Sequence, residues 1–472
     1  MPGRLEFDFH PAPAARKRTQ GPLRLLLVGD FSHRVLADRP ALKERPTLRL
    51  DADRFDTVMA RLAPQLALDG ETLEFEELEH FHPDSLFARV PRFGALRRLR
   101  QRLLDPAQFA QAAAELGGAT EPAPAAAPGG DLLAGLLGGR PAGLAAPPAP
   151  TPTSGIDALV RRIVAPHVRP DTQSQQAELV ASVDAAIAAE MRALLHAPAF
   201  QALEAAWRGA MWLVSTLELD DGLELHLLDV SRDELVADVV ASQGRLAQTA
   251  LHHNLADRWR NLPGGEPWHA LVGLFSFGPG DADIGLAAAM GLISAQAGGP
   301  WLAAADLALA TAEPAALAGW AALRASEAAP WIGLAAPRLL LRQPYGKRSD
   351  PLSSFAFEEF PGTPGHEQLL WGAGSLAVAH LIGRAFNASG WAFEPGDERE
   401  IGDLPAFSFQ LDGETVLQPC AEHLLGEQAG QALLDAGLMP LMSHKHRNAV
   451  TVLRLQSVAH PARPLAGLPH RG

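Results

Sequence analysis

The residues with the clearest potential for chemistry are a glycine-rich segment and a pair of histidines. Residues 372–377 (GAGSLA) match a dinucleotide fingerprint, G-x-G-x-x-A, which requires a preceding strand and a turn that holds a pyrophosphate at a helix start. Residues 366–371 before them have a helical pattern, so we interpret the small residues as a close contact between helices. His444 and His446, spaced i, i+2, would converge on a metal only from a strand, and no carboxylate or cysteine lies nearby. We interpret them as part of a solvated loop.

The other reactive side chains form no recognisable catalytic set. Cys420 is the single cysteine, which excludes an intramolecular disulfide and is typical of a reducing compartment. No neighbouring group would activate its thiol, so we interpret it as a small buried hydrophobe. The sequence contains no Walker phosphate loop and no nucleophile elbow. An enzyme would need a cleft with paired titratable groups, and we therefore expect neither enzymatic activity nor a bound cofactor or metal.

Three further motifs have the character of structural elements. Trp207-Arg208-Gly209 follows an amphipathic segment, where the tryptophan belongs to the core and the arginine can pair with a buried carboxylate. Pro344-Tyr345-Gly346 is typical of a turn, because proline fixes φ and glycine permits unusual φ values. The arginine-rich run 97–102 indicates a solvated helix face, with a contact to an acidic patch elsewhere in the chain as the alternative.

Composition and charge limit the function classes. The length of 472 residues suggests roughly two to four domains. The residues are 47% hydrophobic and 20% charged, which is enough apolar material for substantial cores. The net charge of −14 and the pI near 5.6 argue against a general affinity for nucleic acid or anionic membrane. The N-terminus has no signal-peptide core, and the most apolar stretch, 301–323, is interrupted by Asp306, Glu313 and Pro314. We expect a cytoplasmic protein without direct membrane insertion.

The first part of the chain has the patterns of a small mixed domain. Residues 23–28 (LRLLLV) have the composition of a buried strand, and 55–62 places apolar residues on one helix face. Leu73 and Phe75 alternate with glutamates, as in a half-buried strand. Residues 93–103 predict a second helix. After a disordered tail at 1–21, this small domain is expected to span 22–117.

A change of composition marks a flexible linker at 118–154. Ala, Pro and Gly dominate, and such a segment cannot bury enough apolar surface to offset the entropy of ordering. Within it lies an apolar island, 131–137 (DLLAGLL), which is too short for a stable isolated helix. The residues that would dock as a short helix into a partner's groove are its four leucines, Leu132, Leu133, Leu136 and Leu137. The alternative is an incidental apolar stretch.

The remaining residues predict a larger domain at 155–460, followed by a C-terminal tail at 461–472. Apolar periodicity predicts helices at 179–194, 283–296 and 369–386. Alternating or continuous apolar runs predict strands at 223–227, 270–275, 331–336, 391–393, 407–411 and 450–455. The predicted fold class is α+β, in the sense of a mixed α/β domain.

Two series of short motifs resemble the two subunits of the contractile sheath of type VI secretion systems. The first part resembles the small (TssB/VipA-like) subunit through Gly29-Asp30-Phe31, Asp53-Arg54-Phe55-Asp56, Phe81-His82-Pro83-Asp84 and Leu104-Asp105-Pro106. The second resembles the large (TssC/VipB-like) subunit through Phe200 to Glu204, Trp207-Arg208-Gly209, Pro344-Tyr345-Gly346, Trp371-Gly372 and Pro419-Cys420. Many short motifs in one order are more specific than any single motif.

The resemblance implies a cytoplasmic structural protein. In this family, small and large subunits polymerise around an inner tube, and the sheath shortens to eject that tube. The implied partners are copies of the chain or other sheath subunits, the inner-tube protein and baseplate components. An AAA+ ATPase disassembles such sheaths by pulling on an N-terminal helix of the large subunit, which in this chain maps to 131–137.

The sequence departs from the family pattern in two respects. The two subunits are usually separate chains and are joined here, and the sequence stops soon after Gln456-Ser457, where the large subunit normally continues into a C-terminal segment. The alternative function is therefore a non-polymerising cap, adaptor or assembly factor of the same system. Neighbouring subunits of family sheaths share strands, and 23–28 and 450–455 are the candidate donors unless both are internal strands.

Overall fold

The structure is a computed structural model that describes residues 21–68, 70–118 and 172–469. It divides into two compact units, a larger one that contains the residues up to 89 and from 190 onwards, and a smaller one at 90–189. The class is mixed α/β, as predicted. The units differ from the predicted domains, because residues 21–89 share a sheet with the C-terminal part of the chain instead of forming a core of their own.

A nine-stranded sheet forms the centre of the larger unit, in the order β11-β15-β14-β8-β7-β6-β1-β5-β2. Its strands are β1 (Leu23–Gly29), β2 (Leu48–Leu50), β5 (Leu223–Asp229), β6 (Ala270–Phe277), β7 (Trp301–Ala305), β8 (Ile332–Ala336), β11 (Glu400–Ile401), β14 (Met439–Ser443) and β15 (Val450–Val452). Six of them, from β14 to β5 in this order, are parallel, and β2, β15 and β11 add antiparallel strands at the two edges. Smaller sheets pair β3 (Gln65–Leu68) with β4 (Glu71–Glu74) and β9 (Leu339–Leu340) with β10 (Trp371–Gly372).

Strand β1 lies in the interior of this sheet, between β5 and β6. Leu25 is in register with Leu225 on one side and with Ala270 on the other. Nearly every residue of β1 is buried, as expected for a parallel strand covered on both faces. Strand β15 is likewise paired on both sides, with β14 and β11. Both predicted donor strands are therefore internal strands of this chain.

The order of the parallel strands is that of a doubly wound sheet. Numbered along the chain, the six strands lie in the order 2-1-3-4-5-6, so the winding reverses between β1 and β6. On one face, β-strand residues such as Leu26, Leu228 and Leu271 share a core with Leu286 and Met290. Helix α14 packs on β5, β6, β7 and β8 from the other face, and α8 packs against α14. The helices of these layers are α8 (Pro198–Thr216), α9 (Arg232–Ala241), α10 (Ala250–His252), α11 (Asp281–Ala297), α12 (Ala308–Thr311), α13 (Ala318–Arg324), α14 (Ser375–Ser389) and α15 (Glu427–Asp435).

Aromatic side chains attach the N-terminal segment to α8. Helices α1 (Phe55–Leu62) and α2 (Pro83–Arg89) belong to this segment. Phe31 and Phe55 meet the ring of Trp207 edge-on, with centroids 5.3 and 5.5 Å away. Two more phenylalanines, Phe75 and Phe81, contact Phe200 at 6.0 and 5.7 Å. Such pairs add about 0.5–1.5 kcal/mol each beyond the burial of their area.

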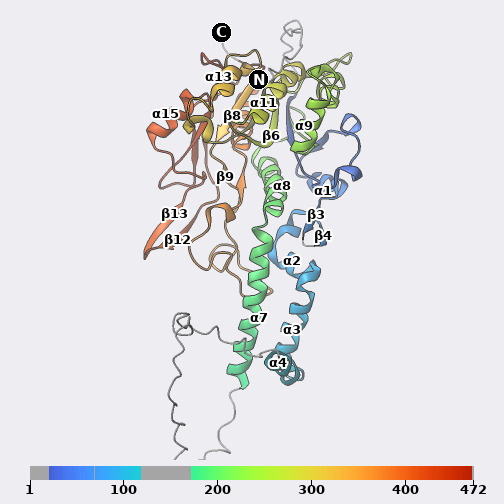
Figure 1. Cartoon of the computed structure of the whole chain (residues 1–472), viewed down its shortest axis with the longest axis vertical. Coiled ribbons are helices and arrows are strands. Elements are labelled where there is room, and N and C mark those ends of the chain that lie inside the picture. Colours follow the sequence, from blue (N-terminus) through green and yellow to red (C-terminus); the bar gives the residue numbers. More distant parts are fainter. Residues whose placement is uncertain (1–20, 69, 119–171, 470–472) are drawn as a thin grey trace, which may run out of the picture. The chain divides into compact units, whose positions relative to one another are not determined.

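The smaller unit is helical. It contains α3 (Gly94–Leu104), α4 (Phe109–Gly118) and most of α7 (Thr172–Leu195), and its boundary with the larger unit falls within α7. Helix α3 runs beside α7 (Figure 1), where Arg100 Nε lies 2.6 Å from an Asp184 carboxylate oxygen. The Gln176 amide donates to the Leu103 carbonyl, and Arg102 pairs with Glu115. The arginine run is therefore partly engaged in ion pairs with acidic residues.

A β-hairpin projects from the rest of the larger unit (Figure 1). Strands β12 (Phe407–Leu411) and β13 (Glu414–Gln418) are joined by Asp412 and Gly413, whose φ values are +51° and +83°. Asp-Gly with two positive φ angles is the preferred two-residue connection of a twisted hairpin. The strand predicted at 407–411 is thus confirmed, and its partner strand is an addition.

Two local predictions are wrong. The helix predicted at 369–386 begins only at Ser375, because Trp371 and Gly372 pair with Leu340 and Leu339 as strand β10. Residues 390–392 form a single 3₁₀ turn after α14 instead of the strand predicted at 391–393, since Gly390 ends the helix with φ +53°. In the C-terminal segment 461–469, Leu465 and Leu468 are buried, and the Ala466 amide donates to the Pro330 carbonyl.

Among the described helices, none combines the length and the hydropathy that a membrane span requires.

Candidate functional site at the carboxyl ends of the strands

A buried arginine links two carboxylates between helix α8 and the loop that follows β9. The Arg342 guanidinium lies 2.9 Å from Glu204 of α8 and 2.8 Å from Glu359, and all three side chains are at least nine-tenths buried. It also covers the ring of Tyr345 at 4.2 Å from the centroid. Each carboxylate is thus paired in a region where an isolated charge would cost several kcal/mol.

The predicted motifs Trp207-Arg208-Gly209 and Pro344-Tyr345-Gly346 meet in this network. Arg208 donates to Glu204 at 2.6 Å and to the Tyr345 hydroxyl at 2.8 Å. The Tyr345 amide donates to Glu359 at 2.8 Å, and the Glu359 amide donates back to the Tyr345 carbonyl. The two motifs are 137 residues apart in sequence but are connected through one hydrogen-bonded network.

Glu359 and Tyr345 each keep one ionisation state near neutral pH. Burial raises the pKa of Glu359, but the charge of Arg342 and hydrogen bonds from His196, Arg342 and the Tyr345 amide outweigh this effect and bring the pKa to about 2. Burial also raises the pKa of the Tyr345 hydroxyl well above its usual range. A general acid or base needs a pKa near the working pH. The network is therefore suited to holding residues 342–359 on α8 rather than to proton transfer.

The other residues of these motifs serve close packing. The Trp207 indole donates to the Phe31 carbonyl at 2.9 Å, which ties α8 to the segment after β1. A Cβ on Gly209 would lie 2.6 Å from the Leu376 side chain of α14. Glycine at this position of α8 therefore allows the two helices to pack closely against each other. A Cβ on Gly346 would meet only the exposed Glu358 carboxylate, which can move away. Pro344 starts the same turn and is half-buried.

A crevice of about 680 Å³ lies at the carboxyl ends of the parallel strands. Asp30 follows β1, Ser276 belongs to the end of β6, and Arg338 follows β8, so the crevice occupies the point where the winding of the sheet reverses. Open α/β sheets bind their ligands at this position. Most of the other lining residues are small or apolar and come from α8, α14 and the segment around β10, among them Pro198, Ala202, Ala206, Trp371 and Leu376. Such a lining can receive an apolar group.

The glycine-rich segment 372–377 contributes to packing beside this crevice. A Cβ on Gly374 would lie 2.8 Å from the Ala335 carbonyl, and one on Gly372 would contact Leu341. The Ser375 hydroxyl donates to the Gly273 carbonyl at 2.8 Å. The segment does start a helix after a short strand, but β10 is antiparallel to β9 and belongs to a separate small sheet. These small residues allow α14 to approach the large sheet closely.

Cys420 and the histidine pair lie outside the network. Cys420 is 2% exposed, and burial raises the pKa of its thiol to about 11, which keeps it neutral. His444 and His446 lie in the segment between β14 and β15, where His444 contacts the Thr451 hydroxyl and His446 is exposed. The four leucines of the apolar island, Leu132, Leu133, Leu136 and Leu137, fall outside the described residues.

Two groupings could not be found from short motifs. The Glu204–Arg342–Glu359 network joins residues 138 and 17 positions apart, and only a carboxylate partner for Arg208 was predicted. His366, Glu422 and His423 also come together, although His366 and Glu422 are 56 positions apart. No local spacing signals such contacts, because loops bring the residues together.

Comparisons with known proteins agree with the arrangement of motifs. The VipB family model, described as the EvpB tail sheath N-terminal domain, matches residues 177–316 and 309–459, together more than half of the chain. The type VI secretion system VipA family model matches residues 3–117. The type VI secretion system sheath protein TssC1 of Pseudomonas aeruginosa is 32% identical over 308 residues. That alignment covers 60% of this chain and 61% of the relative's length.

Proposed function

Because the chain belongs to the VipB tail sheath family and also carries a VipA region, we propose that it is a structural, non-enzymatic subunit of a type VI secretion contractile sheath. The observation that carries this proposal is the position of β1. This strand of the VipA region lies between β5 and β6 of the VipB region. Residues 21–89 of the VipA region thus share one sheet with the VipB region, and on this proposal a single polypeptide supplies what the family's two subunits supply.

The proposed partners are other copies of the chain or companion sheath subunits in the cytoplasm. The inner-tube protein and baseplate components follow from the same family resemblance. So does a disassembly ATPase, with the leucines of the island 131–137 as the segment it would grip. The sequence supports that segment through its composition alone, as a leucine-rich stretch within an Ala-, Pro- and Gly-rich region.

The β12–β13 hairpin is the surface we assign to assembly. It forms a two-stranded sheet, so each strand has one edge outside the hairpin pairing. Leu411 and Leu417 each remain 41% exposed on it. An unpaired edge with apolar side chains is a template for strand addition by another molecule.

Negative-stain electron microscopy of the purified chain, alone and with its companion subunits, tests the proposal. We expect hollow helical tubes. Leu417→Lys should shorten or abolish them, because a charge on the hairpin opposes a buried contact. Leu262→Lys is the matched control, since Leu262 is 56% exposed and lies outside the hairpin.

Compact particles in every sample would contradict the sheath subunit and favour a non-polymerising cap or adaptor. Tubes that form equally well with Leu417→Lys would leave the sheath subunit standing but would exclude the hairpin as a contact. Circular dichroism should show the same fold for all three proteins, because exposed substitutions change stability by only about 0.5 kcal/mol.

A further inference from the structure

We propose that His366, Glu422 and His423 form a binding site for one divalent transition-metal ion of the zinc class. In the described part of the chain, this is the one group of three histidine, cysteine or acidic residues whose ligand atoms all lie within 4.8 Å of one another. Imidazole nitrogen and carboxylate oxygen are the ligands that zinc accepts alongside thiolate.

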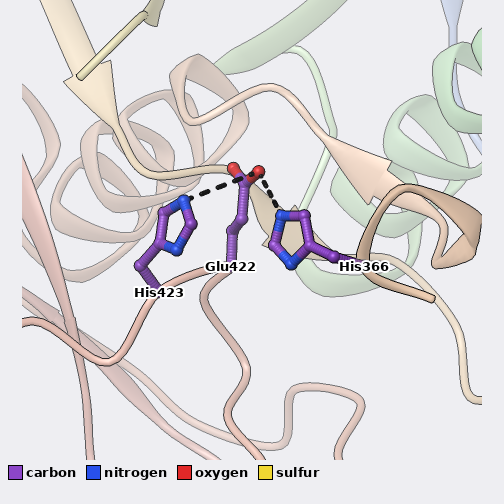
Figure 2. Close-up of side chains that lie close together, drawn as sticks. All are labelled: His366, Glu422 and His423. Carbon is purple, nitrogen blue, oxygen red and sulfur yellow. Dashed lines mark hydrogen bonds and ion pairs between the residues drawn. The ribbon is translucent and has the colours of Figure 1, made fainter. Parts of the chain in front are cut away.

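The Glu422 oxygen already lies at nearly tetrahedral spacing from one nitrogen of each histidine. Glu422 Oε1 lies 2.9 Å from His366 Nε2 and 3.8 Å from His423 Nε2. Bonds of about 2.0–2.1 Å to a tetrahedral ion place neighbouring ligand atoms roughly 3.3–3.5 Å apart. Figure 2 shows the two imidazoles on either side of the carboxylate, with their facing nitrogens directed at it. Small side-chain movements would therefore complete the geometry.

The backbone that carries these side chains is held by neighbouring segments. The Glu422 amide donates to the Arg338 carbonyl at 2.9 Å, next to the bridge between Leu339 and Ala421. The His366 carbonyl accepts a hydrogen bond from the Trp371 indole at 3.0 Å. The two imidazole rings lie 5.2 Å apart and nearly parallel, at 14°. A site on fixed backbone segments needs little reorganisation when the ion binds.

Arg338 hydrogen-bonds the carboxylate of Glu422, the acidic ligand of the site. Its Nε donates to Glu422 Oε2 at 2.9 Å, and its Nη2 donates to Oε1 at 2.5 Å. A carboxylate has about four lone-pair sites, two on each oxygen, so Oε1 can accept the Arg338 Nη2 hydrogen bond on one lone pair and bind an ion with the other, while Oε2 is held by Arg338 Nε. The positive guanidinium weakens the attraction of a cation, and we therefore expect affinity below that of a closed structural zinc site.

The site is open to solvent on the histidine side. The side chains of His366 and His423 are 42% and 45% exposed, whereas Glu422 is 11% exposed. Three protein ligands leave one position of a tetrahedral ion for water or for a group from another molecule. A bound ion would also join two loops that are 56 residues apart in sequence.

A zinc titration of the full chain, first stripped of metal with a chelator, tests the site. Binding is followed by calorimetry, and Co²⁺ is added in a parallel titration because its visible absorption reports tetrahedral ligation. We expect one saturable equivalent for the unchanged chain. His366→Ala and His423→Ala should each weaken binding at least tenfold, in the range of about 10–100-fold seen for disturbed metal sites. Zinc should raise the melting temperature of the unchanged chain by more than that of either histidine variant.

His446→Ala is the matched control, because His446 is an exposed histidine outside the cluster. It should bind zinc like the unchanged chain. The proposal is overturned if no saturable equivalent appears, or if His366→Ala and His423→Ala bind as tightly as the unchanged chain. It is equally overturned if His446→Ala removes the binding, which would place the ion in the loop at 444–446. Each result is independent of tube formation.

Discussion

At the scale of single residues, Arg342 is the side chain on which the buried network depends. Arg342→Ala would leave Glu204 and Glu359 without their main partner in a region from which water is excluded. We expect the free energy of unfolding to fall by about 3–5 kcal/mol, the usual effect of breaking a buried pair. Urea unfolding followed by circular dichroism measures it. Arg348→Ala, at an exposed position in the same loop, should change it by only about 0.5 kcal/mol. Equal effects of the two variants would show that the network contributes no stability.

The low pKa of Glu359 makes stability depend on acidity. Its folded-state pKa of about 2 lies below the ordinary value of 4.5, so ionised Glu359 stabilises the folded chain above pH 4.5. This contribution is lost as the pH falls from 4.5 towards 2. Glu359→Gln should therefore melt at a lower temperature than the unchanged chain at neutral pH, and the difference should shrink over that acid range. A difference that stays constant down to pH 2 would contradict this assignment.

At the scale of elements, most apolar patterns predicted the correct element, and the two that failed lie at the ends of helix α14. The strands at 223–227, 270–275 and 331–336 and the helix at 283–296 are confirmed within two residues, and the helix at 179–194 lies within the longer α7. The run at 369–371 was assigned to a helix, because apolar periodicity cannot separate a short buried strand from a helix. Leu369 and Trp371 instead pack with Leu340.

The β12–β13 hairpin has a clear signal in the sequence. Asp412-Gly413 follows one alternating segment and precedes another, and this dipeptide is the strongest short-range indication of a hairpin. The network at Arg342 carried no comparable signal. Its carboxylates come from α8 and from the loop around Glu359, and a sequence without aligned relatives does not show which distant loops meet.

At the scale of the whole molecule, the pairing of β1 means that the covalent link between the two regions is dispensable once the chain has folded. A protease site inserted between Ala145 and Ala146 would divide the chain without touching the sheet. We expect the two fragments to elute together in gel filtration, because β1 is paired on both sides and four phenylalanines are packed on α8. Fragments that separate without denaturant would contradict this expectation.

The division of the chain was the largest difference between prediction and structure. The apolar pattern of 23–28 correctly predicted a buried strand, but such a pattern is the same whether the neighbouring strands are near or far in sequence. Its partners begin at Leu223 and Ala270. The change in composition at 118–154 indicated a boundary between regions of sequence, and it did not indicate which strands share a sheet.

The location of β1 also has a consequence for synthesis on the ribosome. The strand ends at Gly29, whereas its neighbour β6 is complete only at Phe277. At about 5–20 residues per second, the nascent segment LRLLLVG waits roughly 12–50 s for both neighbours to be translated. During that time its apolar side chains are exposed to chaperones and to other nascent chains. In one polypeptide the wait ends with translation, whereas a strand made as a separate chain would wait for a diffusional encounter whose duration depends on concentration.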